Sequence, residues 1–138
     1  MKNILLIFVF LIIAGCGGTT PQQVDIPPNS DIRADIAFKE DAGVWKADVL
    51  FYFSAPVAPG VKESPPQQIV PVEDPKINNE PLTPATSETG TAYFTTTAAR
   101  PALSNVVSAR INGKLYEGKT IPGSAIPNKK ISVTLSLK

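Results

Sequence analysis

The chain has 138 residues, of which 13 are basic and 12 acidic, with a formal net charge of +1, one cysteine and no histidine. A chain of this length supports one domain, or one domain with a tail. Its near balance of charge shows neither the footprint of a nucleic-acid-binding protein nor a polybasic membrane patch. One cysteine excludes an internal disulfide bond, so we expect burial and hydrogen bonds alone to hold the fold.

The start of the chain has the pattern of a secretory leader. Met1-Lys2-Asn3 is a short positive start, and an unbroken apolar run follows from Ile4 to Ala14. As a helix that run would be about 16 Å long, at roughly 1.5 Å per residue. This is too short to cross a hydrocarbon core of about 30 Å. We therefore predict a signal peptide over residues 1–15 with a helical apolar segment.

The stretch Ile13-Ala14-Gly15-Cys16 resembles the lipobox of bacterial lipoproteins: a branched apolar residue, two small residues and a cysteine. The resemblance implies that the thiol of Cys16 takes a diacylglyceryl group, that cleavage precedes Cys16, and that the new amino terminus is acylated. Ile13, Ala14 and Gly15 would be the signal-recognition residues. The alternatives are an ordinary secretory signal with a chance cysteine, or a short uncleaved anchor.

Two or three acyl chains anchor a protein stably in a membrane, whereas one chain does so only marginally. In enterobacteria-like lipoproteins, aspartate after the cysteine favours the inner membrane, and Gly17 stands there instead. By that analogy we expect anchorage in the outer membrane, facing the periplasm, if the organism has one.

Residues 16–30 are polar, rich in small residues and contain Pro27-Pro28. This composition predicts a flexible tether, with a partner-binding proline motif as the alternative.

The domain, residues 31–138, begins with two predicted strands. Residues 32–38 alternate between apolar and polar, as a strand with one buried face does. Residues 40–43 predict a hairpin turn, and the next strand runs from about Val44 to Phe53. Its polar face becomes apolar at Leu50 and Tyr52, so we expect either a central strand or a loop that folds over that end, and a partner could also cover it.

Residues 56–84 hold eight of the fourteen prolines. Proline lacks the N–H that a ladder needs, so this region cannot form a continuous central strand. Ile69-Val70 and Val72 could form a short edge strand. Residues 77–82 predict a turn between short extended pieces, because asparagine tolerates positive φ.

The remaining predicted strands cover residues 91–97, 106–111, 114–117 and 131–137, while residues 98–104 are ambiguous. Asn112-Gly113 is the strongest hairpin signal in the chain, since a type I′ turn needs positive φ at both positions. We expect Gly118 and Pro122 to end the strand that follows this turn.

Short strands separated by turn signals predict an all-β domain, an antiparallel two-sheet β-sandwich. In size and strand count it is similar to immunoglobulin-like and fibronectin-type modules, and Trp45 resembles their core tryptophan. That resemblance concerns architecture and says little about function. A small barrel is the structural alternative.

The chain lacks the usual catalytic inventory. There is no histidine to act as a base, lipid would consume Cys16, and no phosphate-cradling loop occurs. We therefore expect no enzymatic activity and no cofactor beyond the covalent lipid on Cys16.

Calcium needs only oxygen ligands, and sugars need exposed aromatic rings. The candidate calcium ligands are Asp25, Asp31, Asp35, Glu73, Asp74, Asn78, Asn79 and Glu80, although such residues are also common in solvated turns. The candidate sugar-binding residues are Tyr52, Tyr93, Tyr116 and Trp45, although aromatic residues also pack in strands.

The sequence thus predicts a lipid-anchored cell-envelope protein with a non-catalytic domain, acting as a binding or structural accessory module. Its partners would be the membrane and an envelope protein, with no nucleic acid. We expect the partner surface at Leu50 and Tyr52, next to the proline-rich residues 56–84. The alternative is a small-ligand module that binds carbohydrate or calcium.

Overall fold

A computed structural model of the chain describes residues 23–54, 56, 59–62 and 67–138. The predicted signal peptide, with Ile13, Ala14 and Gly15, and the predicted lipid attachment point Cys16 lie outside the described residues. Within those ranges no helix is long and apolar enough to cross a membrane.

The described residues form ten strands in one antiparallel sheet. The strands are β1 (Asp31–Asp41), β2 (Val44–Ser54), β3 (Gln67–Ile69), β4 (Glu73–Ile77), β5 (Glu80–Pro81), β6 (Thr83–Thr86), β7 (Ala92–Thr96), β8 (Val106–Ile111), β9 (Lys114–Lys119) and β10 (Lys130–Leu137). Their order is β5-β4-β8-β9-β10-β1-β2-β7-β6, and β3 also pairs with β2. The prediction of an all-β antiparallel domain is confirmed.

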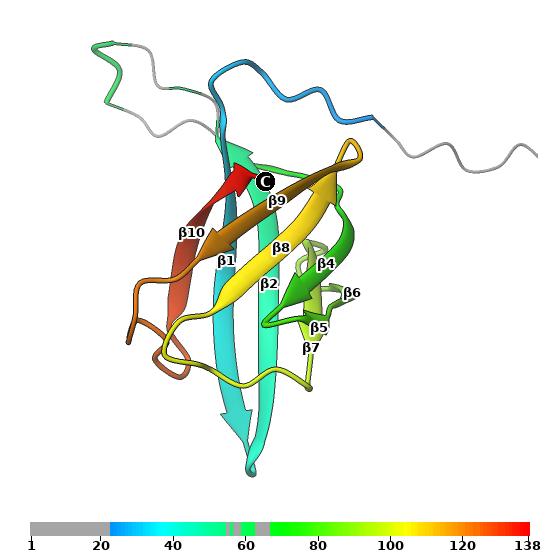
Figure 1. Cartoon of the computed structure of the whole chain (residues 1–138), viewed down its shortest axis with the longest axis vertical. Coiled ribbons are helices and arrows are strands. Elements are labelled where there is room, and N and C mark those ends of the chain that lie inside the picture. Colours follow the sequence, from blue (N-terminus) through cyan, green and yellow to red (C-terminus); the bar gives the residue numbers. More distant parts are fainter. Residues whose placement is uncertain (1–22, 55, 57–58, 63–66) are drawn as a thin grey trace, which may run out of the picture.

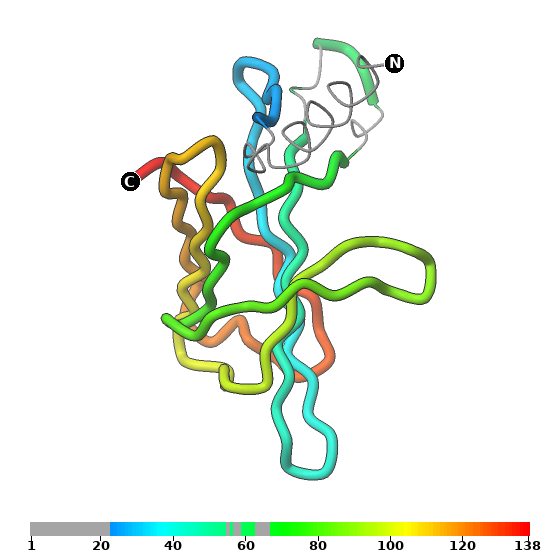
Figure 2. The backbone as a smooth tube through the Cα atoms, turned by 90° about the vertical axis from the view of Figure 1, so that its right-hand side faces the viewer, coloured from blue at the N-terminus to red at the C-terminus, as the bar shows by residue number. Residues whose placement is uncertain are grey.

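The sheet curls until it is nearly closed, like a barrel (Figures 1 and 2). β10 pairs with β1 along most of its length and with β9 only at its end, where Ser136 lies opposite Glu117. On the other side the chain passes from β5 to β6 through Leu82, whose N–H donates to the carbonyl of Pro75 over 2.9 Å. The structure therefore does not divide clearly into the two facing sheets of an immunoglobulin-like sandwich.

Three tight turns adopt the backbone that their residues favour. Asn112 and Gly113 have φ of 51° and 76°, Ala42 and Gly43 have 49° and 80°, and Asn78 and Asn79 have 51° and 68°. Positive φ at both central positions is the type I′ geometry that matches the twist of paired strands. The predicted hairpin turns at residues 40–43 and 112–113, and the turn within residues 77–82, are confirmed.

The prediction that Gly118 ends its strand is wrong, because β9 continues to Lys119. Gly118 is buried where β10 crosses closely over β9. A Cβ at this position would lie 2.6 Å from the backbone oxygen of Thr134 and 2.6 Å from Cγ1 of Val133. Glycine therefore allows the two strands to approach, which strand-interior glycines often do.

The proline-rich region contributes more strand than expected. β3 is short and overlaps the predicted edge strand only at Ile69, since Val70 and Val72 lie outside it, whereas β4 pairs with β8 and so joins the main sheet. Pro75 sits at a register shift between Glu73 and Lys76, and Pro84 sits on β6, which pairs only with β7. Bulges and edge strands are the places where a sheet tolerates proline.

The apolar core lies inside the curled sheet. Its buried members are Ile32, Ala34, Ile36, Phe38, Ala47, Val49, Phe51, Phe53, Val70, Ile77, Leu82, Ala99, Val107, Ala109, Ile111, Val133 and Leu135. The predicted inward faces of the first two strands supply eight of these residues, while Trp45 is only partly buried. Since every buried core residue in the described part of the chain lies after residue 30, we expect residues 17–138 to fold without the leader.

The last part of the predicted tether packs on the domain. Val24 and Ile26 are partly buried against the core. The side chain of Asn112 accepts a hydrogen bond from the N–H of Val24 over 2.9 Å and donates to its carbonyl over 2.8 Å. The chain is thus bound to the β8–β9 turn before β1 begins.

Candidate functional site: the outer face of the sheet

The side chains that point away from the core on β10, β1, β2 and β7 form one surface, which we call the outer face. Strand alternation places every second residue there, and the antiparallel register aligns them in rows across the sheet. Asp35 lies opposite both Ser132 and Leu50, and Asp48 lies opposite Thr95. The outer face comprises Arg33, Asp35, Ala37, Lys39, Lys46, Asp48, Leu50, Tyr52, Tyr93, Thr95, Lys130, Ser132 and Thr134.

A buried carboxylate lies at the centre of this face. Asp35 is only 5% exposed. Its Oδ1 accepts hydrogen bonds from the hydroxyls of Ser132 and of Tyr52, the latter over 3.0 Å. Its Oδ2 pairs with the ammonium of Lys130 at 3.1 Å. Buried charges persist when they are paired in this way, and the hydrogen bond and charge of Asp35 raise the pKa of Lys130.

A second carboxylate, Asp48, lies nearer the β1–β2 turn. It pairs with Lys39 at 2.9 Å and with Lys46 at 3.5 Å, and it accepts a hydrogen bond from Thr95 Oγ1 over 2.8 Å. Burial favours the neutral acid, but hydrogen bonds from Lys39 and Thr95 and the charges of both lysines outweigh it, so the pKa of Asp48 is lowered. The hydrogen bond and charge of Asp48 raise the pKa of Lys39.

Between the two ion pairs lies a hollow of about 330 Å³ that Leu50 lines. Lys39 and Lys130 flank it, while Tyr93 and Ser87 line it from the β6–β7 hairpin. The ammonium of Lys46 lies 5.8 Å from the centre of the Tyr93 ring. The hollow therefore offers an apolar floor, an aromatic wall and a charged rim.

The two residues predicted as a partner surface lie in different environments. Leu50 is half-buried and borders the hollow. Tyr52 is 2% exposed, and its hydroxyl donates to Asp35. Tyr52 thus holds Asp35 within the outer face, and of the two residues only Leu50 has exposed surface for a partner.

Sequence reasoning placed Asp35 among calcium candidates and missed its partners Lys130 and Ser132. Ser132 is 97 residues from Asp35 along the chain. Only the register between β1 and β10 joins them, and alternation in a single strand carries no information about register.

The other predicted ligand sites gain no cluster in the structure. Among the described residues no group of three Asp, Glu, His or Cys side chains could hold a metal ion. Asp74 pairs with Lys76 at 3.1 Å, and Asn78 and Asn79 form the β4–β5 turn. Of the aromatic candidates, Tyr93 borders the hollow, while Tyr116 and Trp45 pack partly buried against the core.

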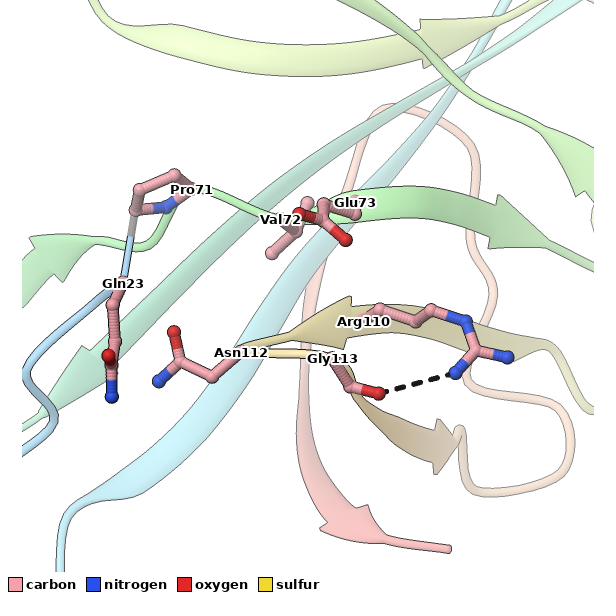
Figure 3. A pocket seen from close by; sticks show the side chains of 7 residues that line it. All are labelled: Gln23, Pro71, Val72, Glu73, Arg110, Asn112 and Gly113. Carbon is pink, nitrogen blue, oxygen red and sulfur yellow. Dashed lines mark hydrogen bonds between the residues drawn. The ribbon is translucent and has the colours of Figure 1, made fainter. Parts of the chain in front are cut away.

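Three further hollows lie outside this face. One of about 430 Å³ is lined by Gln23, Val72, Glu73 and Arg110 near the β8–β9 turn, where Arg110 Nη1 donates to the carbonyl of Gly113 over 3.4 Å (Figure 3). A second, of about 560 Å³, lies between the bound start of the chain and the ends of β8, β9 and β10. The third, of about 420 Å³, lies between β2, β7 and residues 69–72. It is apolar, and Phe51 and Phe94 meet edge to face there with ring centres 5.7 Å apart.

Comparisons of the chain with protein-family models, with curated proteins and with solved structures found no match.

Proposed function

We propose that the protein is a lipid-anchored cell-envelope protein whose domain binds a partner protein through the outer face, without catalysis. The anchor would be lipid on Cys16, as the lipobox resemblance implies. Gly17 after the cysteine favours the outer membrane, with the domain in the periplasm. The domain would serve as an accessory module of an envelope assembly.

The hollow around Leu50 is the observation that supports a partner-binding face. Protein interfaces combine a small apolar or aromatic centre with a polar rim. Leu50 and Tyr93 supply the centre here, and the Asp35–Lys130 and Asp48–Lys39 pairs supply the rim. Because hydrogen bonds from Tyr52 and Ser132 on the two neighbouring strands hold Asp35 in place, the rim is already ordered before a partner arrives.

Site-specific photocrosslinking in the native envelope tests the partner. A photoreactive residue at position 50 should yield a discrete crosslinked protein. The same residue at position 137, exposed on the last strand, is the matched control and should not yield that product. Identical products from both positions, or none from position 50, would overturn the proposed face.

Mass spectrometry of the mature amino terminus tests the anchor separately. We expect a chain that begins at Cys16 and carries acyl mass. Cys16→Ser should remain at full length and lose that mass. An unmodified Cys16 or an intact Met1 in the wild-type protein would refute the lipoprotein assignment.

Carbohydrate binding is the second candidate, and Tyr93 beside the hollow favours it, since sugars stack on aromatic side chains. A glycan array with Tyr93→Ala as control decides between the two functions.

Within the all-β class, the immunoglobulin-like sandwich remains our more specific prediction of the fold, and an experimental structure with two separate layers would support it.

A further inference from the structure

Two loops meet at the end of the barrel opposite the bound start of the chain. They are residues 97–105, between β7 and β8, and residues 120–129, between β9 and β10; we call them the loop pair (Figure 1). The N–H of Gly123 donates to the carbonyl of Leu103 over 2.7 Å, and the N–H of Thr120 donates to that of Asn105 over 2.9 Å. The six-residue strands β8 and β9 separate the loop pair from the Asn112 turn by about 20 Å, at roughly 3.3 Å per residue.

In the loop pair, two polar side chains are buried and two large apolar side chains are exposed. Asn105 and Thr120 are 0% and 4% exposed, whereas Leu103 and Ile121 are 75% and 78% exposed. The buried pair is fully engaged: Thr120 Oγ1 accepts from the N–H of Asn105 over 2.8 Å, and Asn105 Oδ1 accepts from Asn78 Nδ2 over 2.8 Å. These bonds fix both loops in a conformation that leaves Leu103 and Ile121 exposed.

Ile126 in the second loop is 49% exposed and extends the apolar tips to three residues. One exposed leucine is ordinary on a protein surface. Here three exposed branched aliphatic side chains stand on two loops that are hydrogen-bonded to each other, and groups of exposed apolar residues mark interaction sites.

The two loops and the residues that flank them are basic, while the neighbouring β1–β2 hairpin carries Glu40 and Asp41 at its exposed tip. Residues 97–105 and 119–130 contain Arg100, Lys119, Lys129 and Lys130 and no acidic residue. Lys130 pairs with Asp35, whereas among the described residues no ion pair includes Arg100, Lys119 or Lys129. The charge balance of the whole chain hides this local excess.

We propose that the loop pair binds the surface of an anionic phospholipid bilayer. Leu103, Ile121 and Ile126 enter the boundary between headgroups and acyl chains, and Arg100, Lys119 and Lys129 face the lipid phosphates. Apolar tips beside cations match the two layers of a bilayer interface, and binding strength scales with buried apolar area plus attraction to anionic lipid. This goes beyond the partner-binding face, because no residue of either loop lines the outer-face hollow.

A vesicle-capture assay tests this on the full chain. The protein is reconstituted through its N-terminus into neutral phosphatidylcholine vesicles, which needs only an apolar leader or a lipid. A second, fluorescent population containing phosphatidylglycerol should be captured, and a phosphatidylcholine population should be captured far less. Capture should fall steeply between about 0.05 and 0.5 M salt, since screening shortens the range of the interaction.

Two variants separate the contributions. Leu103→Ser/Ile121→Ser should weaken capture at least about tenfold, since both changes remove apolar area that enters the bilayer. Arg100→Gln/Lys119→Gln/Lys129→Gln should weaken it about 100-fold, at roughly fivefold per cation. Lys114→Gln/Leu137→Ser, also exposed but on other parts of β9 and β10, is the matched control and should capture normally.

Absence of capture, equal capture of both lipid populations, or full capture by the loop variants would overturn the proposal. Co-sedimentation of residues 17–138 with the same vesicles gives a second reading that needs no anchor. An unlipidated Cys16 or a missing protein partner leaves the co-sedimentation reading intact, so the two proposals fail independently.

Discussion

At the scale of single residues, the outer face shows how far strand alternation can predict a site. Leu50 and Tyr52 stand out in the sequence because a polar face turns apolar there. The structure shows that the Tyr52 hydroxyl serves Asp35, 17 residues away in the chain. Alternation identifies the shared face, but the contact depends on the β1–β2 register, which the sequence does not specify for a diagonal pair.

Asp48 gives the outer face a dependence on pH that can be measured. Its folded-state pKa is lowered from 3.8. Its ion pairs therefore stabilise the fold fully above the unfolded pKa, and this contribution is lost as pH falls below 3.8 through the folded value. We expect Asp48→Asn to lower the free energy of unfolding by about 1–2 kcal/mol at pH 7.

The check is urea unfolding of both proteins across the acid range. The difference between wild type and Asp48→Asn should shrink as pH falls from 5 toward 2. Asp41→Asn, on the exposed end of the same hairpin, is the control and should change stability little at any pH. A constant difference for Asp48→Asn down to pH 2 would rule out this assignment.

At the scale of elements, the sequence located most strands and turns, because two-residue periodicity and paired Asn or Gly signals are local. The prediction for Gly118 was wrong because glycine is common in turns, and the sequence alone does not show that this glycine lies where β9 and β10 approach closely. The sequence also understated β4, since a strand interrupted by Pro75 is recognisable only when its bulge and its partner β8 are seen together.

Gly118→Ala measures the close approach of β9 and β10. The new methyl group would meet the backbone oxygen of Thr134, which cannot move without shifting β10. Overpacking of this kind costs about 2–3 kcal/mol of unfolding free energy. Chemical denaturation should show this loss.

Gly90→Ala is the matched control for the β9–β10 contact. Gly90 has φ of +83° and nothing within 4 Å of an added Cβ. Its replacement carries only backbone strain, about 1 kcal/mol. Equal losses for Gly118→Ala and Gly90→Ala would show that steric contact with β10 is unimportant.

At the scale of the whole molecule, the all-β class follows from the strand pattern, whereas the degree of closure does not. Alternation says which side of each strand is buried, and a sandwich and a curled sheet share that feature. Closure here depends on β10 bridging both halves and on the crossing at Leu82. Both are long-range pairings that no local pattern specifies.

Residues 17–138 should fold as a cooperative unit without the leader, because they contain the whole core cluster. We expect a β-type circular dichroism spectrum and a single unfolding transition, with coincident midpoints from far-ultraviolet and tryptophan signals. Val107→Ala, a change inside the core, should lower the midpoint markedly, whereas Val44→Ala, at an exposed position, should not. A featureless spectrum for residues 17–138 would contradict this expectation.

The two hydrogen bonds between Asn112 and Val24 limit how far the domain could extend from a lipid anchor on Cys16. Cys16 and Val24 are eight residues apart, so a fully extended chain between them spans at most about 29 Å, at roughly 3.6 Å per residue. Were the chain free up to Asp31, fifteen residues would span about 54 Å. If Cys16 carries the proposed lipid, the two hydrogen bonds of Asn112 would nearly halve the reach of the tether and would keep the domain close to the membrane surface.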